Sequence, residues 1–88
     1  MKREEILSKA EEIVNGARQE TYGNPEDCFA TIAGLWGSYL GIDLSPSDVA
    51  MLMVLLKVAR SRGRKDYADN YVDIAGYAAC AGELTDAK

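Results

Sequence analysis

The chain has 88 residues, of which 48% are apolar and 27% charged, and its formal net charge is −4. This length excludes two complete domains, because each would be too small for a core of its own, so residues 1–88 are predicted to form a single helical domain. The apolar and charged fractions exclude the disordered and fibrous classes. Since a core of this size is only marginally stable, we expect self-association to support it.

The first predicted helix covers residues 3–17. Ile6, Ala10 and Ile13 recur at helical spacing and form one apolar stripe. Glu4 lies in the first turn, where it complements the positive end of the helix dipole. The pattern therefore predicts a helix that packs along one side only.

The second predicted helix covers residues 25–40. Asn24 can cap it, Pro25 suits the first helical position, and Gly41 is a typical residue just past a helix end. Two glycines lie inside it: Gly34 and Gly37. A glycine within a helix costs about 0.5 to 1 kcal/mol relative to alanine, so we expect either close approach of another backbone or a bend.

The third predicted helix covers residues 46–62, with Ser45 as its cap and Asp48 placed to reach back to it. Residues 49–56 are apolar all round, which predicts burial on every side and a central position. A small bundle does not surround a helix completely. We therefore expect a homodimer or higher homo-oligomer that forms through this helix.

The fourth predicted helix covers residues 66–83 and carries a stripe rich in small residues, which lets a neighbouring helix approach closely. The stripe consists of Ala68, Tyr71, Val72, Ala75, Ala78, Ala79 and Gly82. Short loops favour antiparallel neighbours, and no segment has the period of a strand. The predicted fold class is all-α, a four-helix antiparallel bundle completed by homo-oligomerisation. Its predicted helices are residues 3–17, 25–40, 46–62 and 66–83.

Five basic residues lie within residues 57–65 of this acidic chain. Lys57 and Arg60 share one helix face, because residues three apart are neighbours. One interpretation is that the cluster complements the negative end of the helix dipole and extends into solvent. The other is an anion site for a phosphate or an acidic partner.

Asp69, Asn70 and Asp73 lie one turn into the fourth helix. The two carboxylates, four residues apart, repel unless a cation lies between them. That cation is either Mg²⁺ bound by Asp69 and Asp73, or Lys57 or Arg60 of the preceding helix. Solvated surface is the remaining interpretation.

Several function classes are excluded or opposed by composition. The chain has two cysteines and no histidine, too few for a disulfide framework or a structural zinc site. Its longest apolar run, residues 49–56, is far shorter than the roughly 20 residues of a membrane span. We therefore expect a soluble intracellular protein that does not bind a membrane. The net charge opposes nucleic-acid binding, for which only residues 57–65 argue.

The chain resembles a family of small proteins common in bacteriophages and prophages. The resemblance rests on residues 22–29 (Tyr-Gly-Asn-Pro-Glu-Asp-Cys-Phe), residues 56–60 (Leu-Lys-Val-Ala-Arg) and residues 69–78 (Asp-Asn-Tyr-Val-Asp-Ile-Ala-Gly-Tyr-Ala). It implies a cytoplasmic location in a bacterial host.

The same ordered elements are similar to MazG-like all-α nucleoside triphosphate pyrophosphohydrolases, which hold Mg²⁺ with a Glu-Glu-x-x-Glu helix and a Glu-x-x-Asp helix. This resemblance implies a nucleotide ligand and Mg²⁺ as the cofactor. Here Asn70-x-x-Asp73 stands in place of Glu-x-x-Asp, and the chain has no Glu-Glu-x-x-Glu. These departures from the motifs oppose catalysis more strongly than they oppose nucleotide binding.

Two function hypotheses follow. The first is a protein that binds a nucleotide through Lys57, Arg60, Asn70 and Asp73. In the form of a reduced MazG-like enzyme, it also hydrolyses that nucleotide. Arg18 and Tyr22 are expected at the mouth of that site, and Tyr22, Trp36 or Tyr77 can stack on the base. The alternative is a phage accessory or counter-defence protein without enzymatic activity, which binds a host protein or sequesters a signalling nucleotide.

Overall fold

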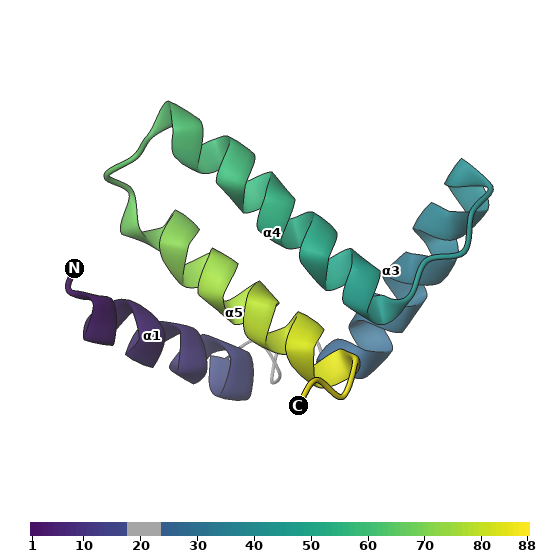
Figure 1. Cartoon of the computed structure of the whole chain (residues 1–88), viewed down its shortest axis with the longest axis horizontal. Helices are drawn as coiled ribbons and strands as arrows, with labels where there is room; N and C mark the ends of the chain where they lie inside the picture. The colour runs from purple at the N-terminus through teal and green to yellow at the C-terminus, as the bar shows by residue number, and fades with distance from the viewer. Residues whose placement is uncertain (18–23) are drawn as a thin grey trace.

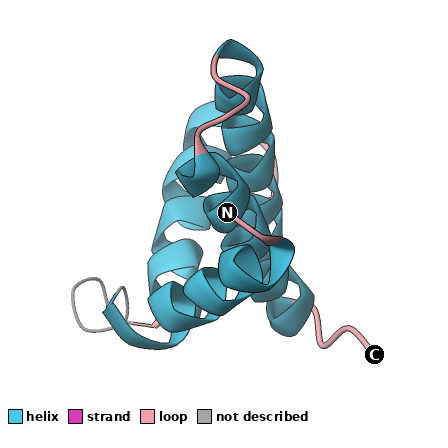
Figure 2. Ribbon diagram, turned by 90° about the vertical axis from the view of Figure 1, so that its left-hand side faces the viewer, coloured by secondary structure: helices cyan, strands magenta, loops and turns pink. Residues whose placement is uncertain are grey.

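The computed structural model describes residues 1–17 and 24–88. Within these residues every regular element is helical and no strand is present (Figure 2). The elements are α1 (Arg3–Glu12), η1 (Ile13–Ala17), α3 (Pro25–Leu40), α4 (Pro46–Gly63) and α5 (Ala68–Leu84). The predicted all-α class is confirmed.

The helix starts follow the predicted capping residues. Asn24 Oδ1 accepts a hydrogen bond from the Asp27 backbone N–H at 3.0 Å, which caps α3. Ser45 Oγ accepts from the Asp48 N–H at 3.0 Å, and the Asp48 carboxylate accepts from the Ser45 N–H at 2.9 Å. This reciprocal pair is a capping box, and it fixes where α4 begins.

The helix ends are also close to the predicted positions. α3 ends at Leu40, and the next residue, Gly41, has a φ of 72°, in the left-handed region that favours glycine. The predicted helix over residues 3–17 is present as α1 followed directly by the wider π-helical turn η1. α5 begins at Ala68, two residues later than predicted, because the preceding turn continues to Tyr67, whose N–H donates to the Arg64 carbonyl.

The helices do not form the predicted antiparallel bundle. α4 and α5 are antiparallel neighbours, but α1 lies against α5 and runs in nearly the same direction (Figure 1). α3 meets the start of α4, and its carboxyl-terminal half projects away from the other helices (Figure 1). The prediction of antiparallel neighbours is therefore correct for α4 and α5 and wrong for the rest.

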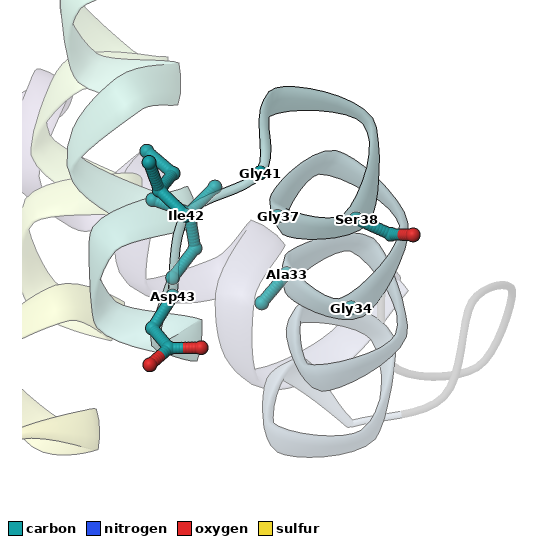
Figure 3. A pocket seen from close by; sticks show the side chains of 8 residues that line it. Ala33, Gly34, Gly37, Ser38, Gly41, Ile42 and Asp43 are labelled. Carbon is teal, nitrogen blue, oxygen red and sulfur yellow. The ribbon is translucent and has the colours of Figure 1, made fainter.

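The close approach between Gly37 and the segment after Gly41 explains the position of α3. This segment runs back along α3 toward the start of α4, and Ile42 and Asp43 lie between the two helices (Figure 3). A Cβ on Gly37 would lie 2.7 Å from the Ile42 carbonyl oxygen. The predicted close backbone approach is thus present at Gly37. A hollow of about 390 Å³ beside it is lined mainly by glycine and apolar residues.

α5, rather than α4, lies at the centre of the structure, between α1 and α4 (Figure 1). A Cβ on Gly76 would lie 3.1 Å from Val14 Cγ1, so the missing side chain lets η1 approach α5 closely. The largest fully buried side chains are Val49 of α4 and Val72 of α5. The small-residue character of α5 therefore permits neighbours on two sides, although Ala78 and Ala79 of the predicted stripe are exposed.

The prediction that α4 is buried on every side is wrong for the single chain. One side of α4 packs against α5 and α3, and five large apolar residues elsewhere on it are exposed: Met51, Leu52, Leu55, Leu56 and Val58. No helix in residues 1–17 and 24–88 is long and apolar enough to cross a membrane. The self-association expected through α4 stays a prediction.

Replacing Gly37 with alanine is expected to lower the free energy of unfolding by roughly 1 to 2 kcal/mol, because the new Cβ would overlap the backbone of Ile42. Gly34, one turn earlier in α3, has open space where its Cβ would lie. Gly34→Ala is therefore a matched control that should be neutral or stabilising, by up to about 1 kcal/mol. Urea denaturation of both variants measures the difference, and equal effects would contradict the close approach.

Candidate functional site

A polar cavity of about 480 Å³ lies between the carboxyl-terminal half of α4, the following turn and the first turns of α5. Its lining residues are Lys57, Arg60, Arg64, Tyr67, Asp69, Asn70 and Asp73. Five of these are residues for which the sequence predicted ligand or metal contacts, and the antiparallel pairing of α4 with α5 brings them together. The two other predicted site residues, Arg18 and Tyr22, lie outside the described residues.

An ion pair joins the two walls of this cavity. Lys57 Nζ of α4 lies 2.9 Å from Asp73 Oδ2 of α5, and the side chains are only 14% and 15% exposed. At this distance the pair is a charge-assisted hydrogen bond in a largely water-excluded place. The sequence left open whether a metal or a protein cation neutralises the acids of α5, and for Asp73 the structure provides Lys57.

Asn70 supplies a neutral polar group to the same wall. The residue is 6% exposed and lies three positions before Asp73, so both face α4. Its carboxamide has no hydrogen-bond partner among the described residues. Every fully buried side-chain nitrogen or oxygen in those residues does have a partner, so the carboxamide atoms are not fully buried. The carboxamide atoms therefore reach the cavity, where they can donate to or accept from a bound molecule.

Among the described residues, three cations line the cavity, and they differ in how firmly they are held. Lys57 is paired with Asp73, whereas Arg60 forms no ion pair within residues 1–17 and 24–88. Arg64 lies 4.6 Å above the Tyr67 ring centre, and its Nε lies 3.6 Å from an Asp66 carboxylate oxygen.

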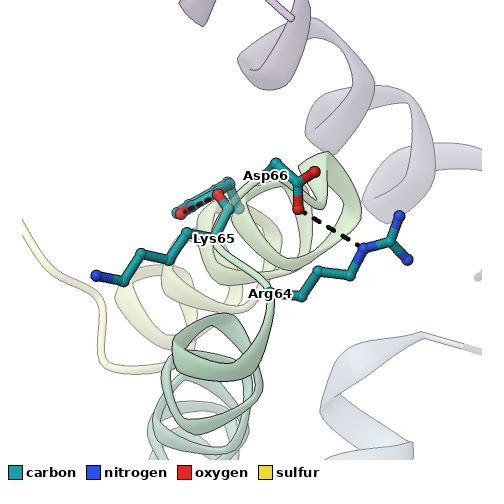
Figure 4. Close-up of polar contacts among 4 residues, drawn as sticks. Arg64, Lys65 and Asp66 are labelled. Atoms are coloured by element: carbon teal, nitrogen blue, oxygen red, sulfur yellow. Dashed lines mark hydrogen bonds and ion pairs between the residues drawn. The ribbon is translucent and has the colours of Figure 1, made fainter.

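The remaining basic residues near the turn do not line the cavity. The Lys65 side chain extends away from that of Arg64, and only Arg64 is turned toward Asp66 (Figure 4). Arg62 is an exposed residue of α4 that is not among the lining residues. Of the cations that the structure describes at the cavity, Arg60 is therefore the most available to an anion.

The donor set fits an anion better than a resident metal ion. Asp73 already contacts the Lys57 ammonium, and Asp69 is exposed at the edge of the cavity. The described residues contain no group of three or more acidic, cysteine or histidine side chains placed to hold a metal. Mg²⁺ usually binds one or two carboxylates together with water and phosphate oxygens, and the Lys57 ammonium beside Asp73 opposes it here. Asp69 and Asp73 as Mg²⁺ ligands therefore stay a prediction.

Tyr67 was not predicted as a lining residue, and Arg64 was predicted only as a member of the basic cluster within residues 57–65. Both belong to the turn between α4 and α5, where no helical period marks the side that a residue faces. The available signal was their spacing of three, which brings an arginine over an aromatic ring. Of the predicted stacking residues, Trp36 and Tyr77 do not line the cavity, and the Tyr77 ring lies 6.2 Å from that of Phe29.

Comparison with known proteins identifies phage-encoded relatives. The Gene 55 protein of Mycobacterium phage L5 is 49% identical over 74 residues, which cover 83% of this chain and 47% of that protein. The Gene 55 protein of Mycobacterium phage D29 is 43% identical over 81 residues, which cover 92% of this chain and 54% of that protein. The chain thus spans about half the length of these relatives.

The resemblance to phage proteins is confirmed by these relatives, whereas the likeness to MazG-like enzymes stays a prediction. No solved structure matches the chain significantly. Residues 5–85 match the family described as "Domain of unknown function (DUF6378)", and the chain therefore belongs to that family.

Proposed function

We propose that the cavity between α4 and α5 binds the phosphate group of a nucleotide. The observation that carries this proposal is that Arg60 and Asn70 line one cavity, and neither has an ion-pair or hydrogen-bond partner for its side chain among the described residues. A guanidinium and a carboxamide that face the same space provide several N–H donors, and phosphate oxygens are strong acceptors. Lys57 adds positive charge beside them, although Asp73 neutralises part of it.

A nucleotide fits this cavity better than inorganic phosphate alone. The volume of about 480 Å³ lies within the usual range for small-molecule pockets, roughly 300 to 1,000 Å³. The Tyr67 ring at its edge, with the Arg64 guanidinium over one face, offers a flat surface for a base. The aromatic partner in this proposal is therefore Tyr67, in place of the predicted Trp36 or Tyr77, and Tyr22 stays a prediction.

The proposal is binding without hydrolysis. The MazG-like resemblance implies a metal-dependent pyrophosphohydrolase, but the described carboxylates fit a resident Mg²⁺ poorly. If the protein is a phage accessory protein, the cavity therefore favours sequestration of a signalling nucleotide as its role. Binding to a host protein stays a prediction, and so does a location in the cytoplasm of a bacterial host. The residues of the cavity bear on neither.

Arg60→Ala is expected to weaken nucleotide binding about tenfold or more, because a charge-assisted hydrogen bond contributes roughly 1.5 to 3 kcal/mol. Arg62→Ala is the matched control, since Arg62 lies on the same helix, carries the same charge and does not line the cavity. Isothermal titration with a panel of NTPs and dNTPs measures both affinities. Equal losses in the two variants would indicate general charge attraction and contradict the site.

The same nucleotide panel also tests hydrolysis, by an assay for pyrophosphate release with Mg²⁺ or Mn²⁺. A binding protein is expected to release none. Release that Asp73→Asn abolishes in a folded protein would instead identify a reduced MazG-like hydrolase. Failure of every nucleotide to bind a folded sample would refute the proposal.

A further inference from the structure

The outer face of α4 combines exposed apolar and charged residues in one stripe. It consists of Asp48, Met51, Leu52, Leu55, Val58 and Arg62. With about 3.6 residues per turn, these side chains all leave the helix within roughly 60° of the direction of Leu55. Val49, Ala50 and Lys57 point to the opposite side, where α4 packs against α5.

This face is unusually apolar for a surface in contact with water. Leu55, at its centre, is 60% exposed, and the other apolar members, Met51, Leu52 and Val58, are exposed as well. Contiguous exposed apolar side chains rimmed by charges are typical of a protein interface. The sequence of the stripe further indicates which partner it fits.

The stripe is complementary to itself when two copies lie antiparallel. A two-fold axis at Leu55 places Asp48 of one copy opposite Arg62 of the other, so each end forms an attractive pair. It also places the long Met51 opposite the small Ala59, which allows the two helices to approach closely. A parallel arrangement would instead place like charges opposite each other at both ends.

We propose that the outer face of α4 binds a second copy of this chain, in an antiparallel α4–α4 dimer centred on Leu55. Opposed helix dipoles add to the favourable charge pairing at both ends. The cavity lies on the other side of α4, because Lys57 and Arg60 face α5 and the turn. The dimer therefore leaves the proposed nucleotide site open, and the two proposals can fail independently.

Sedimentation of the full chain over a range of concentrations tests this proposal. The wild-type chain is expected to dimerise, and Leu55→Glu is expected to raise the dimer Kd at least tenfold, because it buries an unpaired charge at the axis. Circular dichroism confirms that the variant is folded. A wild-type chain that is monomeric at about 100 µM, or an assembly that Leu55→Glu leaves intact, would overturn the proposal.

Charge exchange tests the antiparallel register separately. Arg62→Glu and Asp48→Lys should each weaken self-association, since each places like charges at both ends of its own dimer. Because Asp48→Lys also removes half of the capping box of α4, circular dichroism first checks that both variants are folded. An equal mixture of the two variants should recover most of the lost affinity, because every end contact in the mixed dimer is attractive. Failure of the mixture to recover, with both variants folded, would refute this register.

Discussion

Asp73→Ala is expected to lower the free energy of unfolding by about 3 kcal/mol. The substitution leaves the Lys57 ammonium, which is 14% exposed, without the carboxylate that lies 2.9 Å from it. Removal of one member of a buried ion pair typically costs roughly 3 to 5 kcal/mol, because the remaining charge stays desolvated. Urea denaturation followed by circular dichroism measures this loss.

Two further variants separate the ion pair from general effects of the substitution. Asp66→Ala breaks the exposed pair with Arg64, and solvent screening should limit its effect to about 0.5 kcal/mol. Lys57→Met combined with Asp73→Leu removes both charges, so the double variant should be more stable than the sum of the two single effects implies. Simple additivity would contradict a coupled pair.

Asn70→Asp is expected to weaken nucleotide binding about tenfold to a hundredfold with little change in side-chain volume. The substitution adds a third carboxylate to a cavity that already contains Asp69 and Asp73, and phosphate is repelled by it. Asp69→Asn makes the opposite change at the edge of the same cavity and should strengthen binding. Isothermal titration without added metal measures both changes.

The same two variants distinguish direct phosphate binding from binding through Mg²⁺. If a metal ion bridges the acids and the phosphate, then with Mg²⁺ present the added carboxylate should strengthen binding and the loss of Asp69 should weaken it. That reversal of sign would contradict the anion site proposed here. It would also restore the metal ligands Asp69 and Asp73 that the sequence predicted.

Local interactions explain which parts of the fold could be predicted from the sequence. The caps of α3 and α4 depend on residues within three positions of each other, such as Ser45 and Asp48, so the helix starts were predictable. The placement of α3 depends instead on a backbone contact between Gly37 and Ile42 that no apolar period encodes. The apolar run of α4 was misleading for a related reason, because apolar character does not say which sides of a helix the rest of the chain covers.

The candidate site shows the same division. Lys57 and Asp73 lie in contact because α4 and α5 form an antiparallel pair. The short loop between these two helices predicts that pairing from the sequence. Asn70 follows from its helical spacing to Asp73. Arg64 and Tyr67 lie in the intervening turn, whose conformation depends on hydrogen bonds such as the one from the Tyr67 N–H to the Arg64 carbonyl.

The described residues that line the polar cavity all lie in one uninterrupted stretch, residues 57–73. Contacts between residues so close in sequence cost little loop-closure entropy, so the cavity can assemble early in folding. Local openings of α1, or of the projecting end of α3, leave this stretch paired within the α4–α5 hairpin. This part of the proposed binding site is thereby insulated from partial unfolding elsewhere in the chain.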